Sequence, residues 1–121
     1  MSCYYTFRYA DKTETKIKWA VKLFKDWQAS RNIRALHSGS QLSPIIVQLE
    51  EMSVDEINYS VCRFITEVRK LDGSDYPGDT LHTLVIMLQL YLCVKGNAYK
   101  LLVDDRFAEI RNALDNMMKL Y

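Results

Sequence analysis

A helix start that follows a proline–glycine pair is the strongest candidate binding position in this sequence. Pro77 and Gly78 end any preceding element, and a long apolar run begins at Leu81. The polar residues of the expected first turn are Asp79, Thr80, His82 and Thr83. Free backbone N–H groups and the positive end of the helix dipole favour an anion at such a position. We therefore expect a phosphate at Thr80, with His82 and Thr83 beside it. Asp79 or Thr80 is expected to cap the helix.

A stripe of lysines on an earlier helix is the second candidate contact. Lys18, Lys22 and Lys25 are spaced by four and three residues, which places them on one helical face. No carboxylate intervenes on that stripe, whereas a merely soluble helix usually pairs its lysines with glutamates. A solvated lysine face is the alternative interpretation. We expect the stripe and the helix start at Thr80 to face the same ligand, with Arg63 and Lys70 adding contacts.

Residues for catalysis or metal binding form no recognisable pattern. The sequence has no glycine-rich phosphate loop and no known hydrolase or metalloprotease motif, and His37 lies far from His82. Three cysteines, an odd number, show no metal-ligand spacing and are expected to be reduced thiols: Cys3, Cys62 and Cys93. We predict that the chain is not an independent enzyme and uses no cofactor, metal or small-molecule substrate.

Size and composition are those of one soluble globular domain. The chain has 121 residues, a hydrophobic content of 49% and a net charge of +1, which argues against a general polyanion binder. The charge is uneven, because basic residues dominate from Lys12 to Arg34 and acidic residues from Glu50 to Asp75. Neither a signal peptide nor a membrane-spanning segment is visible, so an intracellular protein without membrane contact is expected.

The elements that must position these residues are all helical. The run from Leu81 to Val94 is apolar almost all round, which is typical of a helix buried between neighbours. Its second apolar face contains Ile86, Leu90 and Cys93. A first helix is expected from Asp11 or Thr13 to about Ser30, and a last helix from Asp104 or Asp105 to the C-terminus.

Two further helices are expected between these. Ser43 and Pro44 are typical of a helix start, predicting a short helix that ends by Met52. Ser53 and Glu56 form a capping box, and the helix they begin is expected to stop at 71–73. The predicted fold is all-α, with four main helices and one short helix. Residues 1–12 are interpreted as an N-terminal arm and 13–121 as a single domain.

Several short motifs occur together in a particular order. They are Lys18–Trp27, Leu49–Ser53, Phe64–Lys70, Asp72–Pro77, Thr80–Leu81 and Asp105–Glu109. In this order they resemble the N-terminal, core-binding-like domain of Crypton-type tyrosine recombinases. They equally resemble the vertebrate proteins derived from such elements, including the glutamine-rich and MYM-type zinc-finger proteins. The resemblance extends from about Thr13 to Met118.

The resemblance implies a small orthogonal SAM-like four-helix bundle that holds one face of duplex DNA in the nucleus. The catalytic residues of such recombinases lie in a following domain, which is not part of this sequence. The expected function is therefore non-catalytic DNA binding, mainly to the phosphate backbone. The alternative is a protein-interaction or homodimerisation module of a nuclear protein. A third interpretation is an enzyme fragment that acts only when joined to its catalytic half.

Overall fold

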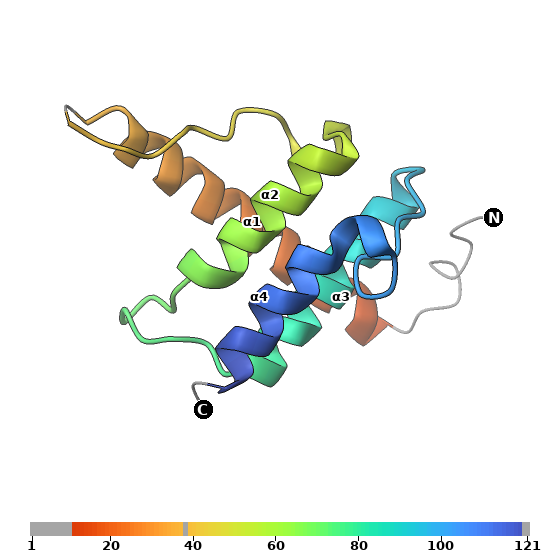
Figure 1. Cartoon of the computed structure of the whole chain (residues 1–121). Helices are drawn as coiled ribbons and strands as arrows, with labels where there is room; N and C mark the ends of the chain where they lie inside the picture. Colours follow the sequence, from red (N-terminus) through yellow and green to blue (C-terminus); the bar gives the residue numbers. More distant parts are fainter. Residues whose placement is uncertain (1–10, 38, 120–121) are drawn as a thin grey trace.

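Four α-helices form a small bundle in the computed structural model, which describes residues 11–37 and 39–119. They are α1 (Asp11–Ala35), α2 (Val54–Glu67), α3 (Gly78–Val94) and α4 (Ala108–Lys119) (Figure 1). Single-turn 3-10 helices, η2 (Leu49–Glu51) and η3 (Asp105–Phe107), precede α2 and α4. Within the described ranges no strand is present, and Arg69 and Asp75 form an isolated β-bridge. The predicted all-α class is confirmed.

The predicted arm, residues 1–12, lies outside the described residues except for the first two residues of α1. The division into arm and domain therefore stays a prediction. No helix in the described part of the chain is long and apolar enough to cross a membrane.

The core lies where two helix pairs meet, because α1 packs chiefly against α3 and α2 chiefly against α4. Phe24, Trp27 and Phe64 join α1 to α2, with ring centroids between 5.2 and 5.5 Å apart. The predicted central helix is confirmed, since Leu84 and Leu88 of α3 are completely buried. Each such side chain contributes about 1.5–3 kcal/mol by leaving water. The core therefore fixes α1 and α3, which carry most of the predicted site.

The capping box at the start of α2 is confirmed. Ser53 Oγ accepts a hydrogen bond from Glu56 N at 3.2 Å, and Glu56 Oε1 accepts one from Ser53 N at 2.8 Å. The predicted end of this helix at 71–73 is wrong, because α2 stops at Glu67. Gly73 instead has a φ of +88° in a tight turn, where Lys70 N donates to Ser74 O at 2.9 Å.

The short helix predicted from Ser43 to Met52 is also wrong, because only the single turn of η2 is helical. Side chains of α1 bind the backbone of this segment instead. Asn32 pairs with both the N–H and the carbonyl of Ile45 at 2.7 and 2.8 Å. Gln28 Nε2 donates to Ile45 O at 2.6 Å and to Val47 O at 2.9 Å. Backbone groups satisfied in this way do not require a helix.

The C-terminal end of α1 and the start of α3 both differ from the predictions. α1 continues to Ala35, five residues past the predicted end at Ser30. α3 begins after Pro77, its N-cap residue, and no side chain caps it, so the predicted capping by Asp79 or Thr80 is wrong. Gly78 packs under α4, where a Cβ atom would lie 2.7 Å from Met118 Cγ.

The predicted start of the last helix corresponds to η3. Asp104 accepts a hydrogen bond from Arg106 N at 2.9 Å, and regular α-helix follows from Ala108. Ile110, Leu114 and Met117 are buried on the inner face of α4, whereas Met118 is 40% exposed.

Candidate nucleic-acid interface

Three exposed lysines follow the solvent side of α1 and form the lysine stripe: Lys18, Lys22 and Lys25. Lys22 Nζ lies 2.7 Å from Asp26 Oδ2, so the expectation of a stripe without a carboxylate is wrong. Both side chains of that pair are mostly exposed, and such pairs stabilise a helix by only a few tenths of a kcal/mol. Among the described residues, Lys18 and Lys25 have no ion-pair partner within 4 Å. Their charges are available to an anion.

A shallow groove of about 440 Å³ runs between the stripe and α3. Its apolar wall includes Ile17 and Val21, and Tyr91 contributes from α3. Tyr91 Oη donates to Glu50 Oε1 at 3.1 Å, and Lys95 Nζ lies 5.6 Å from the centre of the Tyr91 ring. Burial and the bond to Glu50 raise the pKa of Tyr91 to about 12, so its hydroxyl stays neutral at physiological pH. Tyr91 thus lies beside the three lysines of the stripe in the groove and also next to Lys95.

The other predicted contacts lie at the opposite end of α3. Thr80 is half-buried, and Thr83 Oγ1 donates to Asp79 O, which uses its hydroxyl within the helix. His82 lines a separate pocket of about 370 Å³ against α4, together with Arg111 and Asp115. Asp79 is exposed and places a negative charge in the first turn. This end of the helix is therefore less open to an anion than the sequence predicted.

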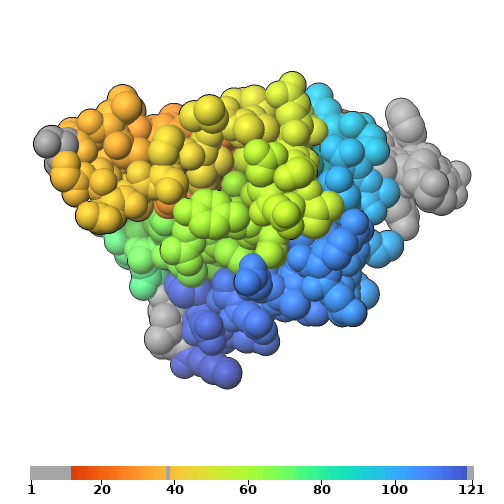
Figure 2. Space-filling view, turned by 45° about the horizontal axis from the view of Figure 1, so that its top comes forward, coloured from red at the N-terminus to blue at the C-terminus, as the bar shows by residue number. Residues whose placement is uncertain are grey.

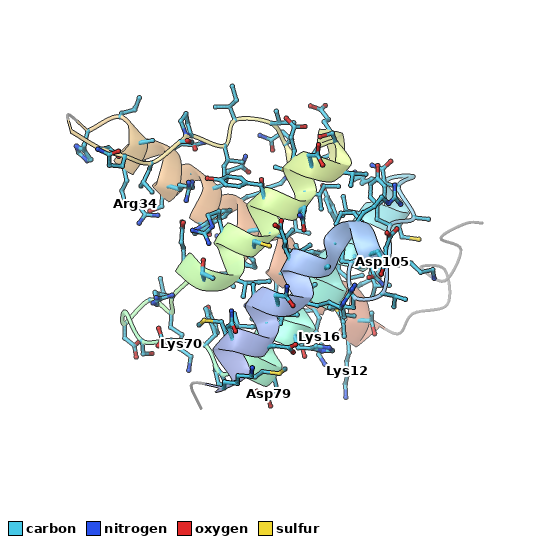
Figure 3. The ribbon with its side chains drawn as sticks, viewed as in Figure 1. Lys12, Lys16, Arg34, Lys70, Asp79 and Asp105 are labelled. Atoms are coloured by element: carbon cyan, nitrogen blue, oxygen red, sulfur yellow. The ribbon has the colours of Figure 1, made fainter. Side chains whose placement is uncertain are left out.

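Arg63 and Lys70 belong to neither group. Arg63 is half-buried in a polar groove of about 560 Å³ between α2 and α4. Lys70 lies in the turn after α2, with its Nζ 5.9 Å from the ring centre of Tyr76. Figure 3 shows Lys70 on this turn, whereas Lys12 and Lys16 project from the N-terminal end of α1. The basic residues thus surround the molecule.

The structure therefore does not bring all the predicted residues together. Thr80 and Tyr91 are separated along α3 by about 16 Å at 1.5 Å per residue. Eleven residues make about three turns, so both positions lie on the same side of that helix. The lysine stripe and Thr80 therefore lie at separate points along α3, and the expectation that both face the same ligand stays a prediction.

Sequence reasoning missed Tyr91, which lines the groove beside the stripe, and Lys95, which lies next to the Tyr91 ring. Tyr91 lies in the C-terminal turn of α3, a helix that sequence interpretation assigned to the core. A tyrosine in an apolar run is usually a core residue, so no local signal distinguishes it. Packing of α1 against α3 alone brings Tyr91 to Lys25.

Other chemistry is not apparent in the described part of the chain. No group of three metal-ligating side chains occurs there. Cys62 is a free thiol whose pKa is raised to about 11, mainly by burial, which makes it a poor nucleophile at neutral pH. The expectation of a reduced thiol holds for Cys62, and Cys3 lies outside the described residues. His37 is exposed in a loop.

Comparison with known proteins identifies relatives of this fold. A family model described as the QRICH1 domain matches residues 14–121. Zinc finger MYM-type protein 2 of Homo sapiens is 24% identical over 110 residues, which cover 86% of this chain and 8% of the relative. Transcriptional regulator QRICH1 of Homo sapiens is 26% identical over 99 residues, covering 74% of this chain and 12% of the relative. No solved structure matches the chain.

These matches confirm the part of the predicted resemblance that concerns glutamine-rich and MYM-type zinc-finger proteins. The Crypton origin stays a prediction. The chain spans only a small fraction of the curated relatives it matches, so it corresponds to one segment of those much longer proteins. Because the family model matches nearly its whole length, the chain belongs to the QRICH1 domain family.

Proposed function

We propose that this chain is a non-catalytic domain of a nuclear regulatory protein and contacts the phosphate backbone of duplex DNA through the lysine stripe. The observation that carries the proposal is the exposure of Lys18, Lys22 and Lys25 on one face, with Lys95 nearby across the Tyr91 groove. Point charges on long flexible side chains suit phosphates, which position a protein on DNA without reading its sequence.

The relatives support the nuclear part of this proposal. One is a transcriptional regulator by name and another is a zinc finger protein, and neither name describes an enzyme. A regulatory protein that works on chromatin needs domains that hold DNA or other proteins. A weakly charged domain with one local lysine stripe fits an auxiliary contact better than sequence-specific recognition.

The start of α3 supplies a second, weaker contact in this proposal. Thr80 lies on the same side of α3 as Tyr91, about 16 Å away by the helical rise. A duplex lying along this side would reach both places. Asp79 opposes a phosphate near Thr80, so the stripe dominates the affinity. Arg63 and Lys70 would contribute only through long-range attraction.

Titration of a fluorescently labelled duplex at several salt concentrations tests the proposal. We expect weak binding at low salt that falls steeply as salt rises, because phosphate contacts release counterions. Lys18→Glu with Lys22→Glu should abolish it. Lys100→Glu with Lys119→Glu makes the same change in net charge at exposed positions elsewhere and should reduce binding only slightly. No binding at low salt, or equal losses in both double variants, would overturn the proposal.

A second candidate function is protein interaction, including homodimerisation. The α3 face predicted for this role is not freely exposed, because Ile86 and Leu90 are partly buried against the core. Exposed apolar side chains elsewhere favour it instead, among them Ile33, Leu36 and Ile46, which are 62%, 85% and 76% exposed. Light scattering tests self-association directly, and a monomer at all concentrations would remove the homodimer.

A further inference from the structure

An apolar pocket of about 310 Å³ lies between segment 44–47 and α2. Figure 2 shows this face, with the segment in yellow beside the yellow-green start of α2. We call it the α2 pocket, and the residues used below are Ile46, Val47, Met52, Asp55, Glu56 and Tyr59. Its volume is at the lower end of the range of ligand sites, which suits one large side chain of a partner.

The walls of the α2 pocket are unusually apolar for a surface. Met52 is 4% exposed and forms part of the inner wall, whereas Ile46 and Tyr59 are 76% and 47% exposed at the edge. Isolated exposed hydrophobics are common, but two large ones bordering the same cavity are typical of an interaction site. A tyrosine at such an edge also offers a large contact area at low entropic cost.

Both sides of the pocket are held in place by hydrogen bonds. Asn32 and Gln28 of α1 bind the backbone of Ile45 and Val47. On the other side, Tyr59 Oη accepts a hydrogen bond from Arg31 Nη2 at 3.1 Å. Little ordering is then required when a ligand binds, and a pre-formed site loses less entropy on association.

Carboxylates at one end of the pocket define the charge of the occupant. Asp55 and Glu56 line it, and Glu51 is exposed just before Met52 in the chain. Within the described ranges none of these three takes part in an ion pair. Arg31, which donates to Tyr59 at the pocket edge, is already paired with Glu67. The pocket edge therefore carries uncompensated negative charge and repels phosphate.

We propose that the α2 pocket binds a short peptide segment of another protein, in which one large apolar side chain lies next to lysine or arginine. The apolar side chain would fill the pocket between Ile46 and Tyr59, and the basic residue would lie against Asp55 and Glu56. Complementary charge of this kind favours one partner class and excludes acidic ones. This proposal does not depend on DNA binding, because it uses a different surface.

The test uses two synthetic peptides that differ only in charge, one with tryptophan between arginines and one with tryptophan between glutamates. We follow their binding by chemical-shift changes in the folded chain. The basic peptide should bind and shift resonances of residues lining the α2 pocket, and the acidic peptide should bind at least about tenfold more weakly.

Asp55→Lys should remove most of the preference between the two peptides, because it inverts the charge of one of the three carboxylates, at an exposed position. Ile46→Asp should reduce binding of the basic peptide about tenfold without unfolding the chain, since this side chain is 76% exposed. Thermal melts of each variant establish that it folds. Asp115→Lys makes the same change in charge at an exposed position on α4, so it is the control and should leave the preference between the peptides nearly unchanged.

Equal binding of both peptides, shifts confined to residues outside the pocket, or no binding of either would overturn the proposal. Self-association that disappears in Ile46→Asp would also overturn it, because the pocket would then be covered by a second copy of the chain. The loss of preference in Asp55→Lys is the decisive result, since non-specific binding to an apolar surface would not depend on that charge.

Discussion

The two halves of α1 use positive charge in opposite ways. In the first half, Lys18, Lys22 and Lys25 stay in water, and within the described residues their one ion pair is that of Lys22 with the exposed Asp26. In the second half, Arg31 is 2% exposed and is bound by surrounding groups. A charge left in water costs nothing to keep and remains available to a ligand. A charge removed from water must be neutralised where it lies.

Arg31 meets that requirement through contacts with three residues in two other parts of the chain. Its guanidinium pairs with Glu67 at the end of α2 and donates to Tyr59 Oη and, at 3.1 Å, to Ser43 O. Glu67 is itself fixed by Trp27 Nε1 at 3.1 Å. The second half of α1 therefore joins α2 and the segment after α1, whereas the first half faces a groove. Similar basic residues on one helix thus serve the fold or a ligand according to their burial.

The largest effect should come from breaking the buried half. Glu67→Ala leaves the Arg31 charge inside the protein without its main partner, and we expect it to lower the free energy of unfolding by about 3–5 kcal/mol. Urea denaturation measures this. Lys22→Ala is the matched change in the exposed half and should alter stability by less than about 0.5 kcal/mol. Similar losses in the two variants would contradict the comparison.

Removing the support of segment 44–47 should have a smaller effect. Asn32→Ala deletes both hydrogen bonds to Ile45 and leaves its N–H without that acceptor, at a cost of about 1–3 kcal/mol. Asn112→Ala, an exposed asparagine on α4, provides the control in the same denaturation assay. If the two variants were equally stable, the segment would not depend on α1 for its conformation.

The pKa of Glu50 depends on two residues of the groove next to the lysines, Tyr91 and Lys25. Burial tends to raise the pKa of Glu50, but its backbone, Tyr91 and Lys25 outweigh this and lower it overall. A carboxyl group whose pKa is lower in the folded state stabilises the fold at pH values above its pKa in the unfolded chain. This stabilisation is lost as the pH falls through its pKa in the folded state. Tyr91→Phe should raise the pKa of Glu50 and reduce stability at neutral pH by about 0.5–1 kcal/mol. Side-chain carboxyl NMR titration checks the first result, and an unchanged midpoint would refute it.

The smallest effect on stability is expected from the exposed ion pair. Asp26→Asn removes the partner of Lys22 and should cost about 0.3–0.5 kcal/mol. The same change frees Lys22 for phosphate, so the duplex should bind more tightly, by less than about tenfold. Weaker DNA binding in this variant would show that the stripe does not act as a phosphate contact.

Elements with a local signal could be predicted from the sequence. The capping box at Ser53 fixed the start of α2, and the apolar run from Leu81 identified the central helix, because both depend on neighbours in the chain. Gly96, with a φ of +98°, lies just past the end of α3, where the apolar run of the sequence also ends. The all-α class follows from these signals alone.

Elements held by distant side chains could not be predicted. Ser43 and Pro44 are typical of a helix start, yet amide groups of α1 satisfy the backbone there. For the same reason α1 extends beyond Ser30, where Arg31 finds partners on α2. Among candidate site residues, the lysine stripe was visible in the sequence as a spacing. The separation of Thr80 from it depends on how α1 crosses α3, and no local pattern carries that information.

The hydrogen bonds from Asn32 and Gln28 to segment 44–47 affect which substitutions this domain can accept during evolution. These amides bind main-chain atoms of Ile45 and Val47, so they hold the segment whatever side chain stands between them. Position 46 can therefore change in size, polarity or charge at little cost to folding. A new preference for a partner can arise there by single substitutions, without any compensating change in the scaffold.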